Sequence, residues 1–169
     1  LVATRAIIFD GAGRVTGLFP FAGGDHGDIC RRPWAGFLLP HPAWMGRREW
    51  FVAHPYREQA LKAQDQELLL RSYRESRFAL IDEILLGYRQ EAISVAKSLV
   101  GRRIFCEALL RQADDLAGWI MAWRGFGYHA LGLVKDLLFA GRANPLRKQP
   151  TEAEIAAFSR LWREVAVQS

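Results

Sequence analysis

Residues 116–140 form a long apolar stretch, and its ionisable residues decide how it can fold. The stretch exceeds the roughly 20 apolar residues that a membrane-spanning helix needs. Four ionisable residues interrupt it: Arg124, His129, Lys135 and Asp136. Each charge near the centre of a span costs about 2.5–3.5 kcal/mol on insertion scales. We therefore expect no transmembrane helix here, and we favour a helix that packs into a protein core.

The same stretch leaves an alternative open, in which the helix lies flat against a membrane surface. Side chains of the kind that such helices carry are present, namely Trp119, Trp123, Lys135 and Arg142. The alternative function of the chain is therefore that of a non-enzymatic helical module, which docks on a membrane surface or on a protein partner.

The first part of the chain has the pattern of strands. Residues 4–9 and 14–19 are two β-rich runs around turn-forming residues at 10–13, which predicts a hairpin. Short apolar segments that suit further strands follow at 36–39, 77–81 and 84–88.

Helical patterns dominate the second part. A short helix is expected within 47–52 and a longer one over 65–74, where acidic residues occupy the first turn and arginine the last, as the helix dipole favours. Beyond Ile93 the chain is expected to be helical, apart from a loop at 141–150.

An apolar stripe supports this helical prediction. Its members follow at spacings of four, seven, four and three residues, which predicts one helical face that includes the intervening Asp114–Asp115 pair. The stripe consists of Phe105, Leu109, Leu116, Ile120 and Trp123.

Capping and breaking signals set the expected ends of the helices. Gly125 and Gly127 are expected to interrupt the stripe, and a new helix is expected from Ala130. Thr151 and Glu154 have the spacing of a capping box, which predicts the start of a last helix.

Composition bounds the fold class and the redox state. The 169 residues suit one domain with a sizeable core, and 50% hydrophobic with 24% charged residues is ordinary globular composition. Strands followed by helices predict an α+β arrangement for this portion. Cys30 and Cys106 are too few for a disulfide scaffold, so we expect reduced thiols and a cytoplasmic setting.

The excess of basic over acidic residues is modest. The net charge of +5 comes from arginines scattered along the chain rather than gathered in one stripe with aromatic residues. A charge of this size supports only weak, salt-sensitive and sequence-blind association with nucleic acid. We therefore expect no nucleic-acid partner.

Residues 23–28 form a glycine-rich loop that includes Asp25, His26 and Asp28. A histidine flanked by carboxylates can bind a divalent metal. A mobile exposed loop explains the same composition and is the favoured interpretation.

Residues 39–51 form a second concentration of functional residue types. Pro40 and Pro42 restrict the backbone around His41, and the large apolar Trp44 lies outside any periodic face. A ligand pocket and a space-filling core plug explain this composition equally well.

Residues 64–67 form a third concentration, with the sequence Gln-Asp-Gln-Glu. Asp65 stands at an expected helix start, where a carboxylate usually accepts backbone N–H bonds. The same position can hold a general base rigidly at the edge of a pocket. From this segment alone, capping is favoured.

Read together, these segments resemble the glycosyltransferase family 2 enzymes. The resemblance covers roughly residues 30–90, through long runs that agree in order and spacing. The runs are LPHPAWMGRREWF at 39–51, AQDQELLLRSY at 63–73, SRFA at 76–79 and ILLGYR at 84–89. The family's pattern has threonine where this chain has Ala43, and glutamate where it has Gln64.

The resemblance implies a nucleotide-sugar-dependent transferase of the GT-A type, with an α/β fold, of which this chain is the acceptor-side, C-terminal portion. Asp65 is then the catalytic base of an inverting transfer, because a carboxylate must take the proton of the attacking acceptor hydroxyl. The resemblance assigns His41, Trp44, Gly46 and Gln64 to acceptor binding. Arginines that suit the donor phosphates are Arg74, Arg77 and Arg89.

The family also implies a divalent metal, Mg²⁺ or Mn²⁺, bound by a DxD-type motif that has no counterpart in these residues. Because the chain begins at Leu1 in a predicted strand, we expect an N-terminally truncated fragment that does not turn over a nucleotide sugar alone. Expected domains are the transferase half at 1–92 and a helical extension at 93–169. Expected partners are a nucleotide-sugar donor and a carbohydrate or lipid-linked acceptor, with peripheral contact at the inner face of a membrane as an addition.

Overall fold

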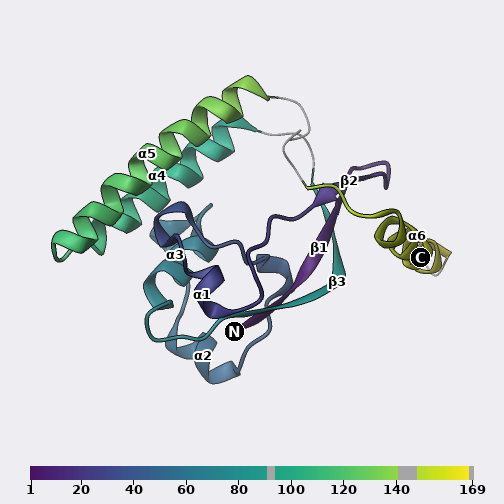
Figure 1. Cartoon of the computed structure of the whole chain (residues 1–169), viewed down its shortest axis with the longest axis horizontal. Helices are drawn as coiled ribbons and strands as arrows, with labels where there is room; N and C mark the ends of the chain where they lie inside the picture. The colour runs from purple at the N-terminus through teal and green to yellow at the C-terminus, as the bar shows by residue number, and fades with distance from the viewer. Residues whose placement is uncertain (91–93, 141–147, 168–169) are drawn as a thin grey trace.

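The structure, a computed structural model, describes residues 1–90, 94–140 and 148–167 (Figure 1). These residues form a three-stranded mixed sheet and six α-helices, a mixed α and β fold as predicted. The strands are β1 (Val2–Phe9), β2 (Val15–Leu18) and β3 (Ala79–Arg89). The helices are α1 (His26–Ile29), α2 (Arg48–Ala53), α3 (Gln64–Ser72), α4 (Val95–Arg111), α5 (Leu116–Leu138) and α6 (Glu152–Val167).

The largely buried β1 is the middle strand of the sheet. Its antiparallel pairing with β2 confirms the predicted hairpin. The turn is held by Asp10, whose Oδ1 accepts the backbone N–H groups of Ala12 and Arg14 at 2.9 and 3.0 Å. The other neighbour of β1 is β3, which runs parallel to it.

β3 joins two segments that the sequence suggested as separate strands, 77–81 and 84–88. Its pairing with β1 is irregular, because Thr4 faces Ile81 whereas Arg5 already faces Ile84. The intervening residues bulge from the ladder, and Asp82 bonds Arg5 at 3.0 Å. The charged pair at 82–83 therefore marks a bulge inside one strand.

The strand predicted at 36–39 does not form. Instead, the Gln66 side chain bonds the backbone of Phe37 on both sides: its Oε1 accepts the N–H at 2.7 Å and its Nε2 donates to the C=O at 3.2 Å. Gly36 has a φ of 93°, and a Cβ there would lie 2.8 Å from Gln66 Oε1. The Gln66 side-chain amide thus makes the backbone hydrogen bonds that a neighbouring strand would otherwise make. Glycine is required at position 36 because the amide comes close to it there.

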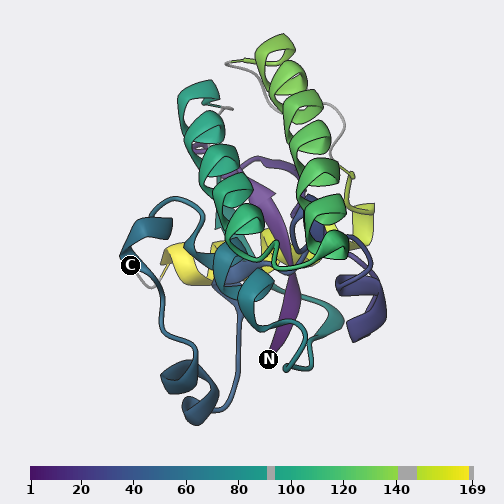
Figure 2. The same cartoon turned by 90° about the vertical axis from the view of Figure 1, so that its left-hand side faces the viewer.

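α4 and α5 form an antiparallel hairpin that lies on one side of the sheet (Figures 1 and 2). The predicted single stripe is therefore wrong: Asp115 lies between the helices and caps α5, accepting the N–H of Gly118 at 2.7 Å. Gly125 and Gly127 do not end a helix. A Cβ on Gly125 would collide with Leu109 of α4, so this glycine allows the two helices to pack closely.

The hairpin shares a hydrophobic core with the rest of the molecule. The predicted border between residues 92 and 93 lies outside the described residues, but α4 and α5, which follow it, share one buried cluster with residues of α3 and β1, and α4 packs on α3. Its members include Ala3, Leu39, Leu69, Leu70, Phe78, Phe105, Leu109 and Met121.

α6 lies on the opposite side of the sheet from the hairpin (Figures 1 and 2). The predicted capping box is confirmed, since Thr151 Oγ1 accepts the Glu154 N–H at 3.2 Å and the Glu154 carboxylate accepts the Thr151 N–H at 2.7 Å. Phe158 and Trp162 cover Phe9 with ring centroids 5.4 and 4.7 Å away. Across the described part of the chain, no helix has both the length and the apolar character needed to cross a bilayer.

Candidate functional site

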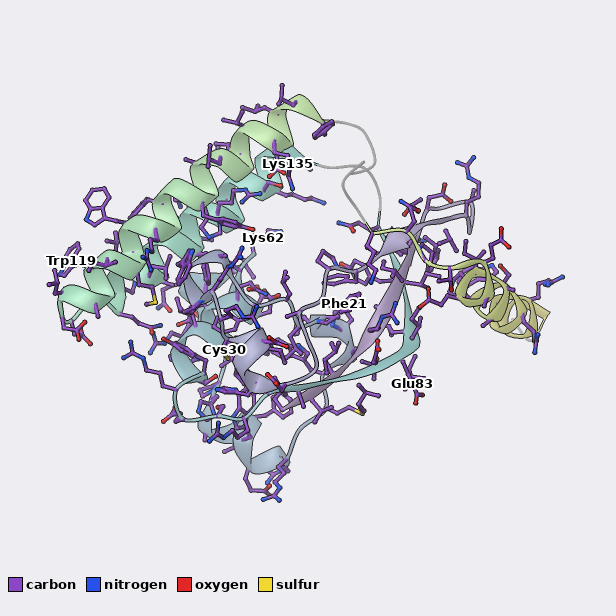
Figure 3. The ribbon with its side chains drawn as sticks, viewed as in Figure 1. Phe21, Cys30, Lys62, Glu83, Trp119 and Lys135 are labelled. Atoms are coloured by element: carbon purple, nitrogen blue, oxygen red, sulfur yellow. The ribbon has the colours of Figure 1, made fainter. Side chains whose placement is uncertain are left out.

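A cleft of about 800 Å³ opens between the end of β3, the first turn of α3 and the inner side of the α4–α5 hairpin. Figure 3 shows Lys62 between the hairpin and the sheet, on the wall of this cleft. The residues that give the cleft its chemistry are Phe37, Lys62, Asp65, Arg89, Lys97 and Arg102.

Asp65 occupies the second position of α3 and is half-buried. The favoured sequence interpretation, a capping carboxylate, is wrong: α3 begins after Ala63 without a side-chain cap bond. Within the described part of the chain, the Asp65 carboxylate accepts a hydrogen bond from the Gln66 amide at a long 3.4 Å. Asp65 therefore holds a carboxylate on the cleft wall with lone pairs free for another donor.

The other three residues of segment 64–67 have three different structural roles. Gln64 accepts the Lys62 backbone N–H at 2.9 Å and so fixes the turn before α3. Gln66 holds Phe37, as described above. Glu67 is buried and pairs with Arg57 and Arg71 at 3.2 and 3.3 Å. Among the four, Asp65 and Gln66 line the cleft.

The structure brings two predicted acceptor residues close to each other. His41 lies in a short 3₁₀ helix, and its ring is 4.6 Å from the Trp44 ring between centroids. Its Nε2 is 2.9 Å from the hydroxyl of Tyr56, a residue that the sequence analysis missed. Burial and, to a smaller extent, the negative charge of Asp65 raise the pKa of Tyr56. His41, Trp44 and Tyr56 are not among the residues that line the cleft with Asp65.

Gly46 has a different environment from His41 and Trp44. It follows Met45, which forms a bridge with Val2 at the start of β1. A Cβ on Gly46 would lie 3.1 Å from both Leu1 and Phe51. This glycine thus allows a close chain approach.

The three predicted phosphate-binding arginines are separated. Arg89 ends β3 and lines the cleft. Arg74 stacks on Tyr73, and that hydrogen-bonded ring together with the more distant Asp115 and Asp114 raises its pKa. Arg77 is exposed, and its carbonyl accepts a bond from the terminal amine of Leu1. Neither Arg74 nor Arg77 lines the cleft.

Two lysines that sequence reasoning missed join Arg89 in the cleft. Lys62 has a φ of 86°, an unusual conformation for a residue other than glycine. Lys97 lies in the first turn of α4. Among the described residues, no carboxylate pairs with Lys62, Arg89 or Lys97, so this wall carries uncompensated positive charge.

A buried polar group forms the hairpin side of the cleft. Arg102 of α4 bonds Asp136 of α5 at 2.8 Å and places Nη1 3.2 Å from His129 Nδ1. Because a guanidinium only donates, Nδ1 must accept, which leaves His129 neutral with its proton on Nε2. His129 and Asp136 are spaced by seven residues on an apolar helix, and this spacing was the sequence signal of a shared buried face.

We predict that His129 makes the protein less stable in mild acid. Burial first, and the Arg102 charge second, lower the pKa of His129 from 6.5 to about 4, against a smaller opposing effect of the Trp34 backbone. Between these two pH values the unfolded chain binds a proton that the folded chain excludes, so stability falls as the pH is lowered. The free energy of unfolding should be about 2 kcal/mol lower at pH 5 than at pH 7 from this group.

Urea unfolding at both pH values measures this loss, with His129→Gln as the comparison because glutamine keeps an acceptor and does not titrate. The drop in stability should be about 2 kcal/mol larger in the wild type than in the variant. Equal drops in the two proteins would contradict the assignment.

The loop at 23–28 is more ordered than expected. Asp25 caps α1 by accepting the Asp28 N–H at 2.8 Å, His26 Nδ1 accepts the Phe78 N–H at 3.2 Å, and Asp28 pairs with Arg31. Within the described ranges, no three side chains of the metal-binding types gather in one place. The polar groups of this loop are thus engaged in holding the chain.

The two cysteines are free thiols, as expected. Burial raises the pKa of Cys30 to about 11, and burial also raises the pKa of Cys106. Because the thiolate is the reactive form, neither cysteine is an activated nucleophile.

Comparison with protein-family models, with curated proteins and with solved structures found no significant match for this chain. The resemblance of segments 39–51 and 63–89 to family 2 glycosyltransferases therefore rests on the sequence runs themselves.

Proposed function

We propose that the chain is the acceptor-side part of a nucleotide-sugar-dependent glycosyltransferase, with Asp65 as the general base. One observation carries this proposal: a half-buried carboxylate without a capping bond or a cation partner among the described residues faces a cleft with unpaired cations. Asp65 is at the second helical position and not at the N-cap, so its carboxylate does not cap the helix and remains available to a group in the cleft.

The proposed chemistry follows from that position. The Asp65 carboxylate accepts the proton of an acceptor hydroxyl as the hydroxyl oxygen attacks the anomeric carbon of the donor sugar. The bond from that carbon to the nucleoside diphosphate breaks on the opposite face, so the configuration inverts. His41 and Tyr56 lie outside the cleft lining and Trp44 packs against the core, so in this proposal they bind a more distant part of the acceptor.

The unpaired cations suit the phosphates of the donor. Arginine binds phosphate oxygens in a bidentate manner, whereas lysine contributes a point charge. Arg89, Lys62 and Lys97 are the groups that the cleft offers, in place of the Arg74 and Arg77 suggested by the sequence. The described residues do not provide a ligand set for the implied Mg²⁺ or Mn²⁺, so we derive no step through a metal.

Product stereochemistry tests the proposal. The natural polypeptide that contains these residues is incubated with sugars activated by uridine, guanosine or thymidine diphosphate, and the anomeric configuration of the product is measured by NMR. We expect transfer with inversion, because a base that activates the acceptor produces a single displacement. Retention of configuration, or no transfer from any of these donors, would contradict the proposal.

A further inference from the structure

The outer side of α5, opposite the cleft, is strongly apolar and exposed. Trp119 lies at the free end of the hairpin and points away from the molecule (Figure 3). Trp123 is 71% exposed and Leu131 is 74% exposed, and the large hydrophobic side chains continue to the end of the helix. The exposed set on the outer face is Leu116, Trp119, Ile120, Trp123, Leu131, Val134, Leu137 and Leu138.

Helix geometry places these side chains on one stripe. At 100° per residue they fall within a sector of about 120°, while Gly125, His129 and Asp136 occupy the opposite, buried side. Arg124 and Lys135 are eleven residues apart, so they follow one flank of the stripe three turns from each other. The outer face is therefore an apolar stripe with cations along one edge.

The charge of this face has one sign. Arg124 lies over the Trp34 ring at 5.2 Å, and within the described ranges neither Arg124 nor Lys135 pairs with a carboxylate. The acidic residue of α5, Asp136, is buried on Arg102. Asp114 and Asp115 are confined to the turn at the hairpin tip.

We propose that the outer face of α5 docks on an anionic lipid surface, with its tryptophans and leucines at the headgroup–acyl boundary. Interfacial helices combine such an apolar face with basic side chains and are attracted to anionic lipids. Tryptophan suits this boundary because its ring is apolar and its N–H is polar. The chain would thereby be held with the cleft on the side that faces away from the bilayer.

Charge argues for lipid over a second copy of the chain. In a symmetric pair, each protomer presents the same patch, so the two apolar stripes meet and no carboxylate is brought to either cationic edge. Such cations are costly to bury without partners. An anionic headgroup layer provides the missing negative charge for both Arg124 and Lys135.

Vesicle binding tests this inference without any assay of sugar transfer. The 169-residue chain is mixed with vesicles of phosphatidylglycerol and phosphatidylcholine in equal parts, and partitioning is measured by flotation. Trp119→Ser combined with Trp123→Ser should weaken partitioning about 100-fold, and Arg124→Gln combined with Lys135→Gln about 30-fold. Vesicles of phosphatidylcholine alone should bind the wild type much more weakly.

Matched variants make the result specific. Val52→Ser with Leu61→Ser removes exposed apolar side chains elsewhere, and Arg103→Gln removes an exposed cation of α4; both should leave partitioning unchanged. Unfolding in urea should change by less than about 1 kcal/mol for every variant, since the altered side chains are exposed apart from the half-buried Lys135. The inference is overturned if the wild type does not bind the mixed vesicles, if the double tryptophan variant binds equally, or if the face instead forms a dimer that this variant dissociates.

Discussion

Replacing Arg102 with methionine is expected to lower the free energy of unfolding by about 3 kcal/mol. The guanidinium bonds Asp136 through Nε and Nη2 at 3.1 and 2.8 Å, and the carboxylate is almost fully buried. Without Arg102 the Asp136 charge stays in the protein interior with no compensating cation. Gly132 shows how closely the contact fits, because a Cβ there would collide with the Arg102 guanidinium.

The neighbouring arginine offers a matched control. Arg103 is 72% exposed and pairs with Glu107 on the surface, so Arg103→Met should change stability by less than about 0.5 kcal/mol. Combining Arg102→Met with Asp136→Leu removes the stranded charge and should recover most of the loss. Urea unfolding at pH 7 measures all three. A loss of stability below about 1 kcal/mol for Arg102→Met, or no recovery in the double variant, would show that the Arg102–Asp136 pair does not stabilise the packing of α4 on α5.

Elements with local sequence signals were predicted well. The turn chemistry of Asp10 predicts the β1–β2 hairpin, and the reciprocal spacing of Thr151 and Glu154 predicts the start of α6. These succeed because the bonds that form the element lie within a few residues of chain. The resulting interactions do not depend on what packs against them.

Elements decided by distant partners were not predicted. Residues 36–39 look like a strand, but Gln66, which lies 29 residues away from Phe37, supplies the backbone bonds. Gly125 looks like a helix breaker, but it accommodates Leu109 of the neighbouring helix. In both cases the deciding contact joins segments whose proximity no local pattern encodes.

In the candidate site, too, residues within recognisable sequence runs were predicted, and residues brought in by distant packing were not. The runs that carry the family resemblance drew attention to His41, Trp44 and Asp65. Of these, Asp65 lines the cleft, whereas His41 contacts Trp44 and Tyr56 outside it. Lys62 and Lys97 were missed because cleft formation depends on how α4 packs beside α3. Gln64, predicted to bind the acceptor, accepts the Lys62 backbone N–H and does not line the cleft.

Asp65→Asn should lower the rate of sugar transfer about 10²–10⁴-fold, the usual contribution of general base catalysis. Asparagine has nearly the same shape and cannot take the acceptor proton. The stability cost should stay below about 1 kcal/mol, because the carboxylate makes no capping bond and loses only its interaction with the helix dipole. A purely structural residue would show the opposite pattern, with a stability loss and near-normal transfer by the folded fraction.

The most direct test of the account therefore compares kcat/KM for transfer in the natural polypeptide with that of Asp65→Asn and of Glu58→Gln. Glu58 is an exposed carboxylate in the 3₁₀ helix Glu58–Ala60, shortly before α3, and its loss serves as the control. The account predicts that Asp65→Asn loses at least about 100-fold while Glu58→Gln stays within about 2-fold and both remain folded. Transfer by folded Asp65→Asn at the wild-type rate would contradict Asp65 as the base.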